Sequence, residues 1–510
     1  MSIIDVIDSY GKYENVRVAH RYRESVMTYR QLMEKSDELA SYIIEKFNKD
    51  NTPVVVCGHK QHEMLICFIA CVKSGHAYIP LDSSLPVERI RDIIENSGTR
   101  MILSVGTLTA SVEERTNVIN IDEIHSLISQ YKGRKPDESF RVKPEDTYYI
   151  IYTSGSTGKP KGVKITLSCL ESFAAWGVKI CNLDNAIAHV FLNQAPFSFD
   201  LSVMDLYISL SSGSMLFSID KEMTANLKEL FHYFGKSGLT HWVSTPSFAE
   251  MCLADKSFNE QLLPDLELLL FCGEILNSSC AKKLLERFER ARVVNLYGPT
   301  EATVAVTSVD IDYELCTAPQ PLPVGRVKEG CKIFIVDQAG SEVPDGEKGE
   351  ILIAGDSVST GYYKNIEMTQ KVFSKLVIDG IEKRCYKTGD EGYMIKGLLH
   401  YCGRMDFQVK LNGYRIELED IENNLRNIDF IEKAVVLPVY KNDKIQYLAA
   451  AVILNRVVED TDFKIGIVIK NELKKFLPEY MIPRKIVIKD TLTMTPNGKV
   501  DRKALMEGIK

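Results

Sequence analysis

The chain has 510 residues, of which 45% are apolar and 26% charged, and its formal net charge is −7. Because a single hydrophobic core stops growing at roughly 250–300 residues, we expect more than one domain, of ordinary globular composition. The negative charge argues against nucleic acid as a partner, and the lack of any apolar run of the ~20 residues that span a bilayer argues against membrane insertion.

The N-terminus and the cysteines favour a cytoplasmic protein. Residues 1–17 carry acidic side chains where a secretory signal is basic and then apolar. The 12 cysteines include no CxxC pair, so we expect of them neither a metal site nor a disulfide framework. Free cysteines are typical of a reducing compartment.

Residues 53–82 predict a β-α-β unit. A β-rich run over 53–58 precedes an apolar segment of helical length over 62–75 and a second strand-like run over 76–82. The same alternation recurs over 240–298. It is typical of a parallel sheet covered by helices.

The pattern changes twice in the last third of the chain. From Gly325 onward, short strands alternate with glycine turns, which predicts a mainly antiparallel, barrel-like region. From about Arg415, a compact α+β domain of about 100 residues is predicted. Its predicted elements are a helix over 415–427, strands over 433–440 and 446–454, a helix over 465–478 and a strand over 484–490. We place the boundary near 404–406, giving domains 1–404 and 405–510.

A glycine-rich loop, YTSGSTGKPKG over 152–162, follows a strand-like segment. Successive backbone N–H groups in such a loop can form an anion site, to which its lysines add positive charge. It is not a Walker A loop, because only two residues separate Gly155 from Gly158 and Pro160 follows Lys159. Phosphate binding is favoured over the alternative, a flexible solvated loop.

The segment NLYGPTEATVAV contains a second candidate site. Tyr297 precedes a Gly-Pro turn at 298–299, where an aromatic ring could stack on a nucleobase. Glu301 offers hard oxygen ligands suited to Mg²⁺ carried by phosphates. The alternative is a strand-turn-helix corner with Thr300 near a helix start, and the two readings are about even.

Three further segments are weak when taken one at a time. Asp390 in YKTGDEGY is suited to holding two ribose hydroxyls, although a lone TGD is usually a turn. GRMDFQVKLNGYRIE carries Arg404, Asp406 and Lys410 at the suspected domain boundary, where charged residues are commonly only solvated. Lys499 follows an Asn-Gly turn near the C-terminus, where lysines are usually inert.

Together and in this order, the five segments resemble the motif set of the adenylate-forming superfamily, which includes adenylation domains of nonribosomal peptide synthetases, acyl-CoA synthetases and firefly luciferase. The match covers essentially the whole chain. The resemblance implies an α/β fold with a large N-terminal domain, made of two α/β subdomains and a distorted β-barrel, and a small mobile α+β C-terminal domain. It also implies ATP and Mg²⁺ as cofactors.

The resemblance assigns roles to individual residues. Tyr297 would stack on adenine, Asp390 would hold the ribose and Glu301 would hold Mg²⁺. Lys499 would be catalytic, reaching the substrate carboxylate and the α-phosphate. The residues implied in ATP binding are Thr153, Ser154, Gly155, Ser156, Thr157, Gly158, Lys159, Asn295, Leu296, Tyr297, Gly298, Pro299, Thr300, Asp390, Tyr401, Cys402, Gly403, Arg404 and Lys499.

The superfamily uses one site for two half-reactions, and the resemblance implies the same here. The first would form an acyl-adenylate and pyrophosphate. The C-terminal domain would then turn about a hinge at Asp406, withdraw Lys499 and bring Lys410 and Gly413 to the site. There a pantetheine thiol would attack the adenylate, and the small Gly413 suits a narrow thiol channel.

The segment FSFDLSVMDLY bears on which acid is activated. Asp200 is a carboxylate among apolar residues, and its alternative role is a helix N-cap with Leu201 opening the helix. In amino-acid-activating relatives an aspartate at this place pairs with the substrate ammonium. A buried carboxylate requires such a partner, so an amino acid is favoured over a fatty acid.

The pocket-forming segments resemble those of superfamily members that activate D-alanine. The likeness covers 191–207, 242–253, 270–276 and 295–306. It implies that Cys272 and Val304 line the side-chain pocket, although the residues alone favour a buried strand cysteine at Cys272. The D-enantiomer rests on this resemblance only.

The resemblance further implies transfer of D-alanine to the phosphopantetheine thiol of a separate D-alanyl carrier protein, and onward to teichoic acids of the bacterial cell wall. No carrier domain is expected after the predicted α+β domain, which reaches almost to Lys510. Alternatives are a stand-alone adenylation enzyme for another small amino acid, a CoA ligase, which Asp200 disfavours, and a nucleotide-binding regulator without chemistry, which Lys499, Asp390 and Glu301 disfavour.

Overall fold

The computed structural model describes most of the chain, and three predicted site residues fall outside it. Ser156, Thr157 and Lys499 lie outside the described residues. The described ranges are 2–14, 16–47, 50–112, 116–155, 158–183, 187–441, 444–456, 460–493 and 502–507.

The first α/β layer is a sheet in the order β6-β5-β3-β4-β7-β8, parallel at every pairing except the β7–β8 hairpin. Its central strands are buried, as continuous apolar runs predict for parallel strands covered by helices. The strands are β3 (Val54–Gly58), β4 (Tyr78–Asp82), β5 (Met101–Ser104), β6 (Asn117–Asn120), β7 (Thr147–Thr153) and β8 (Lys161–Thr166). The helices of this stretch are α2 (Tyr29–Phe47), α3 (His62–Lys73), α4 (Val87–Ser97), α5 (Ile121–Gln130) and the 3₁₀ turn η1 (Glu138–Phe140).

The second α/β layer is a sheet in the order β15-β14-β13-β12-β11-β9-β10-β1-β2, parallel from β13 to β1. The strands are β1 (Val18–Tyr22), β2 (Ser25–Thr28), β9 (Val190–Asn193), β10 (Met215–Ser218), β11 (His241–Ser244), β12 (Leu268–Phe271), β13 (Arg292–Tyr297), β14 (Thr307–Ile311) and β15 (Arg326–Val327). The helices are α1 (Ile3–Tyr13), α6 (Leu167–Ile180), α7 (Leu201–Ser211), α8 (Lys221–Ala225), α9 (Leu227–Phe234), α10 (Pro246–Leu253), α11 (Ser278–Arg287), α12 (Tyr313–Thr317) and the 3₁₀ turn η2 (Thr300–Ala302). Ligands of such open sheets bind beyond the carboxyl ends of the parallel strands.

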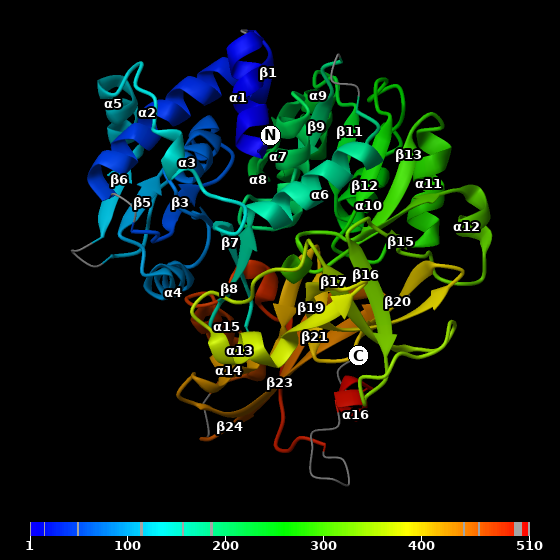
Figure 1. The fold of residues 1–510 in the computed structure, drawn as a ribbon. Coiled ribbons are helices and arrows are strands. Elements are labelled where there is room, and N and C mark those ends of the chain that lie inside the picture. The colour runs from blue at the N-terminus through cyan, green and yellow to red at the C-terminus, as the bar shows by residue number, and fades with distance from the viewer. Residues whose placement is uncertain are drawn as a thin grey trace.

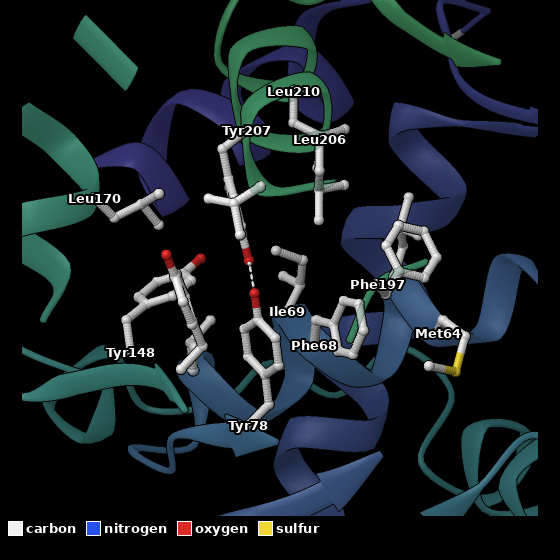
Figure 2. Close-up of a cluster of buried hydrophobic side chains, with 14 of the residues drawn as sticks. Met64, Phe68, Ile69, Tyr78, Tyr148, Leu170, Phe197, Leu206, Tyr207 and Leu210 are labelled. Carbon is white, nitrogen blue, oxygen red and sulfur yellow. Dashed lines mark hydrogen bonds between the residues drawn. The ribbon is translucent and has the colours of Figure 1, made fainter. Parts of the chain in front are cut away.

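Aromatic side chains pack between the two α/β layers. Figure 2 shows Tyr207 of α7 directed at Tyr78 of β4, and their hydroxyls lie 2.7 Å apart. Phe68 of α3 stacks on Tyr78 at 4.3 Å between ring centroids and meets Phe197 edge-on at 5.5 Å. Because Phe197 precedes α7, this cluster fixes the start of that helix relative to the first sheet.

The barrel-like region is an antiparallel sheet in the order β16-β17-β19-β18, with β20 on β19. Its elements are β16 (Cys331–Val336), β17 (Gly349–Gly355), α13 (Ile366–Val372), β18 (Phe373–Ile378), β19 (Ile381–Ile395) and β20 (Leu398–Arg404). The expectation of a turn at TGD is wrong, because Thr388, Gly389 and Asp390 lie within β19. Gly389 accommodates this with a φ of +69°, and the register of β19 shifts close by against β17 and against β20.

The C-terminal region begins with a hairpin of β21 (Gln408–Leu411) and β22 (Tyr414–Glu417). The expected helix from Arg415 therefore begins only at Leu418. Asn412 and Gly413 have φ values of +50° and +83°, as a two-residue type I′ turn requires, and this turn pairs 414–417 with 408–411. The other elements are α14 (Leu418–Arg426), β23 (Ile431–Lys441), β24 (Lys444–Leu454), α15 (Asp462–Leu473), η3 (Glu479–Met481), β25 (Lys485–Ile488) and α16 (Arg502–Glu507), with β23-β24-β25 as a sheet.

The two α/β layers both face the C-terminal region. In Figure 1 the blue-to-cyan first layer lies beside the green second layer, and the yellow-to-red elements lie below both. The carboxyl ends of the second sheet's parallel strands and the β7–β8 hairpin of the first sheet therefore point to the C-terminal region. Across the part of the chain that the structure describes, no helix is both long and apolar enough to cross a bilayer.

The hydroxyl pair between the layers gives a test of their coupling. Tyr207→Phe leaves the buried Tyr78 hydroxyl without its partner, and we expect a loss of about 1–3 kcal/mol in the free energy of unfolding measured by urea denaturation. Adding Tyr78→Phe should cost less than its own single effect, because both hydroxyls are then gone. Tyr13→Phe, at a side chain 83% exposed, is the control. Additive single effects would contradict the coupling.

Candidate functional site

The sequence motifs converge on a cavity of about 40 Å³ between the second sheet, the barrel-like sheet and the β21–β22 hairpin. Its lining comes mainly from segments that the sequence singled out. The lining residues are Phe199, Asp200, Leu201, Cys272, Gly273, Gly298, Pro299, Thr300, Val304, Asp390, Arg404, Gln408, Lys410, Gly413 and Arg415. Predicted ATP-binding, substrate-binding and thiolation residues thus line one small space. Its charged side chains are two carboxylates, Asp200 and Asp390, and three cations, Arg404, Lys410 and Arg415.

Two larger hollows, of about 410 and 420 Å³, lie elsewhere on the surface. One is lined by mixed charges from the barrel-like sheet and α6, and the other lies beside the N-terminal residues. We take the small cavity as the functional site because converging polar groups, and not size, characterise a reaction centre.

Tyr297 and Asp390 are joined at one side of the site. The Tyr297 hydroxyl donates to Asp390 Oδ2 at 2.5 Å, and Arg404 Nη1 donates to Asp390 Oδ1 at 3.0 Å. The Tyr297 ring lies 5.7 Å from that of Tyr401, tilted by 37°. Arg404 also binds Asp406 through Nε at 2.9 Å, and burial would raise the pKa of Asp406 but Arg404 lowers it. The predicted ribose carboxylate and the predicted hinge thus share one guanidinium.

Glu301 is fully buried and is held by groups from three segments. Tyr362 donates to Oε1 at 2.8 Å, Arg415 donates to Oε2 at 2.6 Å, and Lys161 Nζ lies 4.0 Å away. Burial by itself would raise the pKa of Glu301, but Arg415 and Lys161 outweigh it and lower the pKa to about 2. The predicted metal ligand is therefore an anion, and in this arrangement its charge is neutralised by the C-terminal region.

Asp200 stands at the N-cap position of α7 but caps no backbone N–H group. Its Oδ2 instead accepts a hydrogen bond from the Thr300 hydroxyl at 2.6 Å. Burial raises the pKa of Asp200, while Thr300 and the charge of Lys410 oppose the rise. A cation beside Asp200 would therefore stabilise its ionised form.

Cys272 and Val304 form the apolar part of the cavity. The Cys272 Sγ lies 3.7 Å from the Val304 carbonyl oxygen, and burial raises the pKa of this thiol to about 12. Cys272 thus stays a neutral, small wall residue. Thr303 has a φ of +59° and Val304 one of +69°. Positive φ values are strained for β-branched residues, and here they turn the backbone around this pocket.

The glycine-rich loop joins β7 to β8 and contacts the C-terminal region. The Ser154 hydroxyl donates to the Arg415 carbonyl at 2.8 Å and accepts from the Glu417 N–H at 3.2 Å. A Cβ at Gly155 would lie 2.2 Å from the Lys159 carbonyl oxygen, so the loop needs glycine there. Lys159 itself is exposed. The Thr153 Oγ1 is buried without a hydrogen-bond partner.

The β21–β22 hairpin is fitted closely against the second sheet. The Gly413 N–H donates to Glu274 Oε1 at 2.7 Å, and the Ser247 N–H donates to Glu274 Oε2 at 3.1 Å. A Cβ at Gly413 would lie 2.5 Å from Thr245 Cγ2. Only glycine allows this approach, and the φ of +83° favours it as well.

Several residues predicted to bind ATP do not line this cavity. The Asn295 side chain donates to the Pro323 carbonyl at 2.8 Å, and Leu296 belongs to the buried core. Cys402 is exposed on β20, and neither it nor Gly403 reaches the cavity. For these residues ATP binding remains a prediction that could involve the backbone only.

Sequence reasoning missed Arg415, Tyr362 and Glu274. The sequence-based interpretation places Arg415 at a helix start, where a contact to Glu301 is not expected. The Asn-Gly pair at 412–413 was a usable signal, because it is typical of a two-residue hairpin turn. Nothing in the local sequence indicates Tyr362 or Glu274, since both act through contacts distant along the chain.

Family models and curated proteins match the chain along most of its length. The sequence profile of the AMP-binding enzyme family matches residues 9–363, and that of the AMP-binding enzyme C-terminal domain matches residues 420–499. The chain is 48% identical over 509 residues to a D-alanine–D-alanyl carrier protein ligase of Bacillus cereus, with 100% of both chains covered. It is 47% identical over 509 residues, again with 100% coverage of both, to the protein so described in Bacillus thuringiensis (strain Al Hakam).

Solved structures share the fold. The Vibrio cholerae adenylation domain AlmE, in complex with glycyl-adenosine-5′-phosphate, superposes with a TM-score of 0.82 at 23% identity, covering 99% of this chain and 96% of that one. PA1221, a nonribosomal peptide synthetase protein containing adenylation and PCP domains, gives a TM-score of 0.81 at 24% identity, covering 99% and 84%. These likenesses confirm the expected fold, with a large N-terminal and a small C-terminal domain.

The buried ion pair of the site predicts a pH dependence of stability. The pKa of Glu301 falls from an ordinary value of 4.5 to about 2 on folding, so its contribution is fully present above pH 4.5 and is lost as the pH falls toward 2. In urea denaturation the wild type should exceed Glu301→Gln by about 3 kcal/mol near pH 6, with the difference shrinking below pH 4.5. Glu347→Gln, on an exposed turn, is the control. A difference unchanged between pH values of about 6 and 3 would contradict this assignment.

Proposed function

This chain belongs to the AMP-binding enzyme family, within the group of D-alanine–D-alanyl carrier protein ligases, and from that premise we propose that it activates D-alanine with ATP and passes it to a separate carrier protein. It is a ligase that forms AMP. We propose further, from the resemblance of the pocket segments, that the D-alanyl group goes on to teichoic acids of the cell wall. The carrier would present a phosphopantetheine thiol.

The substrate assignment rests on Asp200, the carboxylate at the polar end of the small cavity. Asp200 caps nothing and faces a space walled by Cys272 and Val304. An α-ammonium is the cation that would pair with Asp200, and a methyl side chain fits a wall built of a thiol and a small branched residue. A fatty acid has no ammonium to offer, so Asp200 argues against a CoA ligase for such acids.

In the first half-reaction a carboxylate oxygen of D-alanine attacks the α-phosphorus of ATP. An acyl–phosphate bond forms, and pyrophosphate leaves with the electrons of the broken bond. The nucleophile is already an anion, so the step needs charge stabilisation and not a general base. Lys499 is our proposed source of that stabilisation, and Tyr297 and Asp390 our proposed contacts for adenosine.

In the second half-reaction the pantetheine sulfur attacks the acyl carbon. A thioester forms, AMP leaves, and the thiol proton passes to solvent. We infer that the described arrangement corresponds to this step, because Lys410 and Gly413 line the cavity and the hinge residue Asp406 is held by Arg404. The domain division at 404/405 is part of the same proposal: β20 ends at Arg404 and β21 begins at Gln408.

Mg²⁺ is proposed to bind at Glu301 during the first half-reaction. The carboxylate suits a hard cation, and Arg415 holds that charge when the hairpin is docked. Binding of metal therefore requires the hairpin to withdraw. When bound, Mg²⁺ would neutralise phosphate charge.

We place the reaction in the cytoplasm. The proposed reaction consumes ATP, and the cysteines are free and, apart from Cys331 and Cys402, buried. Such cysteines are typical of a reducing compartment.

The function is tested by amino-acid-dependent exchange of labelled pyrophosphate into ATP. We expect exchange with D-alanine to exceed that with L-alanine and glycine, because the pocket is proposed to be shaped for the D-methyl group. Asp200→Asn, which keeps the size but removes the charge, should lower D-alanine-dependent exchange by about 100-fold through loss of the ammonium partner. Stronger exchange with L-alanine or glycine would assign the enzyme to another small amino acid.

The two proposed uses of the site are tested by two variants with opposite effects. Gly413→Ala introduces a Cβ against Thr245 Cγ2, so it should slow transfer of D-alanine from preformed adenylate to the carrier while leaving pyrophosphate exchange near normal. Lys499→Ala should abolish exchange and spare transfer.

Gly380→Ala is the control for Gly413→Ala. Its φ of +79° carries the same backbone strain, but a Cβ there meets nothing within 4 Å. Equal loss of both half-reactions in either active-site variant would refute the two-arrangement proposal.

A further inference from the structure

A second polar cluster lies at the amino ends of three central strands of the second sheet. His189 immediately precedes β9, His241 is the first residue of β11, and Glu267 immediately precedes β12. These strands are neighbours in the order β12-β11-β9 and run parallel, so their amino ends meet. The site described above lies beyond their carboxyl ends, about 13 Å away for strands of this length.

We propose that His189, His241 and Glu267 form a zinc-binding site. One ligand atom from each residue lies within 4.8 Å of the others. In tetrahedral zinc with ligands at about 2.0–2.1 Å, the ligand atoms lie about 3.3 Å apart. The exposed Glu267 side chain has the rotational freedom to close that difference.

The second observation is the state of His189. Its side chain is 6% exposed, and neither ring nitrogen has a hydrogen-bond partner. A buried imidazole without partners costs free energy, and native proteins rarely leave both nitrogens unsatisfied. Its ring centroid lies 5.0 Å from that of His241, with the two planes at 80°, so the two imidazoles are neighbours. A metal ion would satisfy the His189 nitrogen that lies within 4.8 Å of the ligand atoms of His241 and Glu267.

His241 has the surroundings of a metal ligand. Its Nδ1 lies 2.8 Å from the Thr240 hydroxyl, while Nε2 lies 3.5 Å from the Cys181 carbonyl oxygen. A ligating histidine commonly gives its other N–H to an oxygen, which fixes the tautomer and the ring orientation. In the tautomer that donates Nδ1–H to Thr240, Nε2 carries the lone pair, and a metal bound there would replace the contact with the Cys181 carbonyl oxygen.

The charges and the access around the cluster suit a cation. The nearby guanidinium of Arg292 is paired with Asp310 at 2.8 Å and donates to the Ile180 carbonyl at 3.0 Å. Glu267 is exposed, so the ion would enter from solvent at that side. Two imidazoles and one carboxylate are a known zinc ligand set, with water in the fourth position. The ion would link the amino ends of β9, β11 and β12, whose carboxyl ends face the proposed reaction site.

The test uses the full chain without a histidine tag, titrated with Co²⁺ as a spectroscopic substitute for Zn²⁺. We expect one equivalent of Co²⁺ to bind with the intense visible absorption of a tetrahedral site and to be displaced by Zn²⁺. Glu267→Gln should weaken this binding by about 10-fold or more. Glu286→Gln, an exposed carboxylate on α11, should leave it unchanged.

His189→Gln supplies a second variant, and D-alanine-dependent pyrophosphate exchange shows that each variant is folded. If the variants exchange pyrophosphate normally and lose the Co²⁺ spectrum, the site is established. If wild type gives no saturable tetrahedral spectrum, or if Glu267→Gln binds as tightly as wild type, the proposal is refuted. The Co²⁺ titration itself does not depend on which amino acid the enzyme activates.

Discussion

The ion pair between Glu301 and Arg415 is the contact on which the arrangement of the site depends. Glu301 is fully buried on the N-terminal side, and Arg415 reaches it from the C-terminal hairpin at 2.6 Å. Removing a charged group from water costs several kcal/mol, which a single well-placed partner can offset. Neither residue is stable in this environment without a counter-charge. The docked position of the hairpin therefore depends on the Glu301–Arg415 ion pair and not on apolar packing alone.

Several other contacts of the hairpin at this interface are polar, beside the ring contact of Tyr414 with Phe199 at 5.8 Å. Ser154 binds the backbone on both sides of Ile416 in the strand that carries Arg415, and Glu274 binds the turn at Gly413. Polar contacts of this kind can be exchanged for water or for ligand groups at modest cost, whereas a large apolar interface cannot. Polar contacts of this kind are compatible with the proposed movement of the C-terminal domain.

The sequence was sufficient where structure depends on local pattern. Continuous apolar runs indicated the parallel strands, and glycine-rich turns indicated the antiparallel sheet, because burial and backbone freedom act over a few residues. It could not decide between a cap and a ligand for Asp200, since the partner, Thr300, is 100 residues away along the chain. Asp390 was expected in a turn because TGD is locally turn-like, yet pairing with two neighbouring strands prevails. The same limit hid Arg415 and the histidines at the far edge of the sheet.

The register of the hairpin has an electrostatic consequence. Lys410 lies directly opposite Arg415 across the two strands, so two like charges stand side by side. They are tolerated because Asp200 and Glu301 lie close to them. The hairpin thus acts as an internal counter-ion for the site. Whatever replaces it must restore electroneutrality at these two carboxylates, and the proposed substrate ammonium at Asp200 and the proposed Mg²⁺ at Glu301 would each meet that requirement.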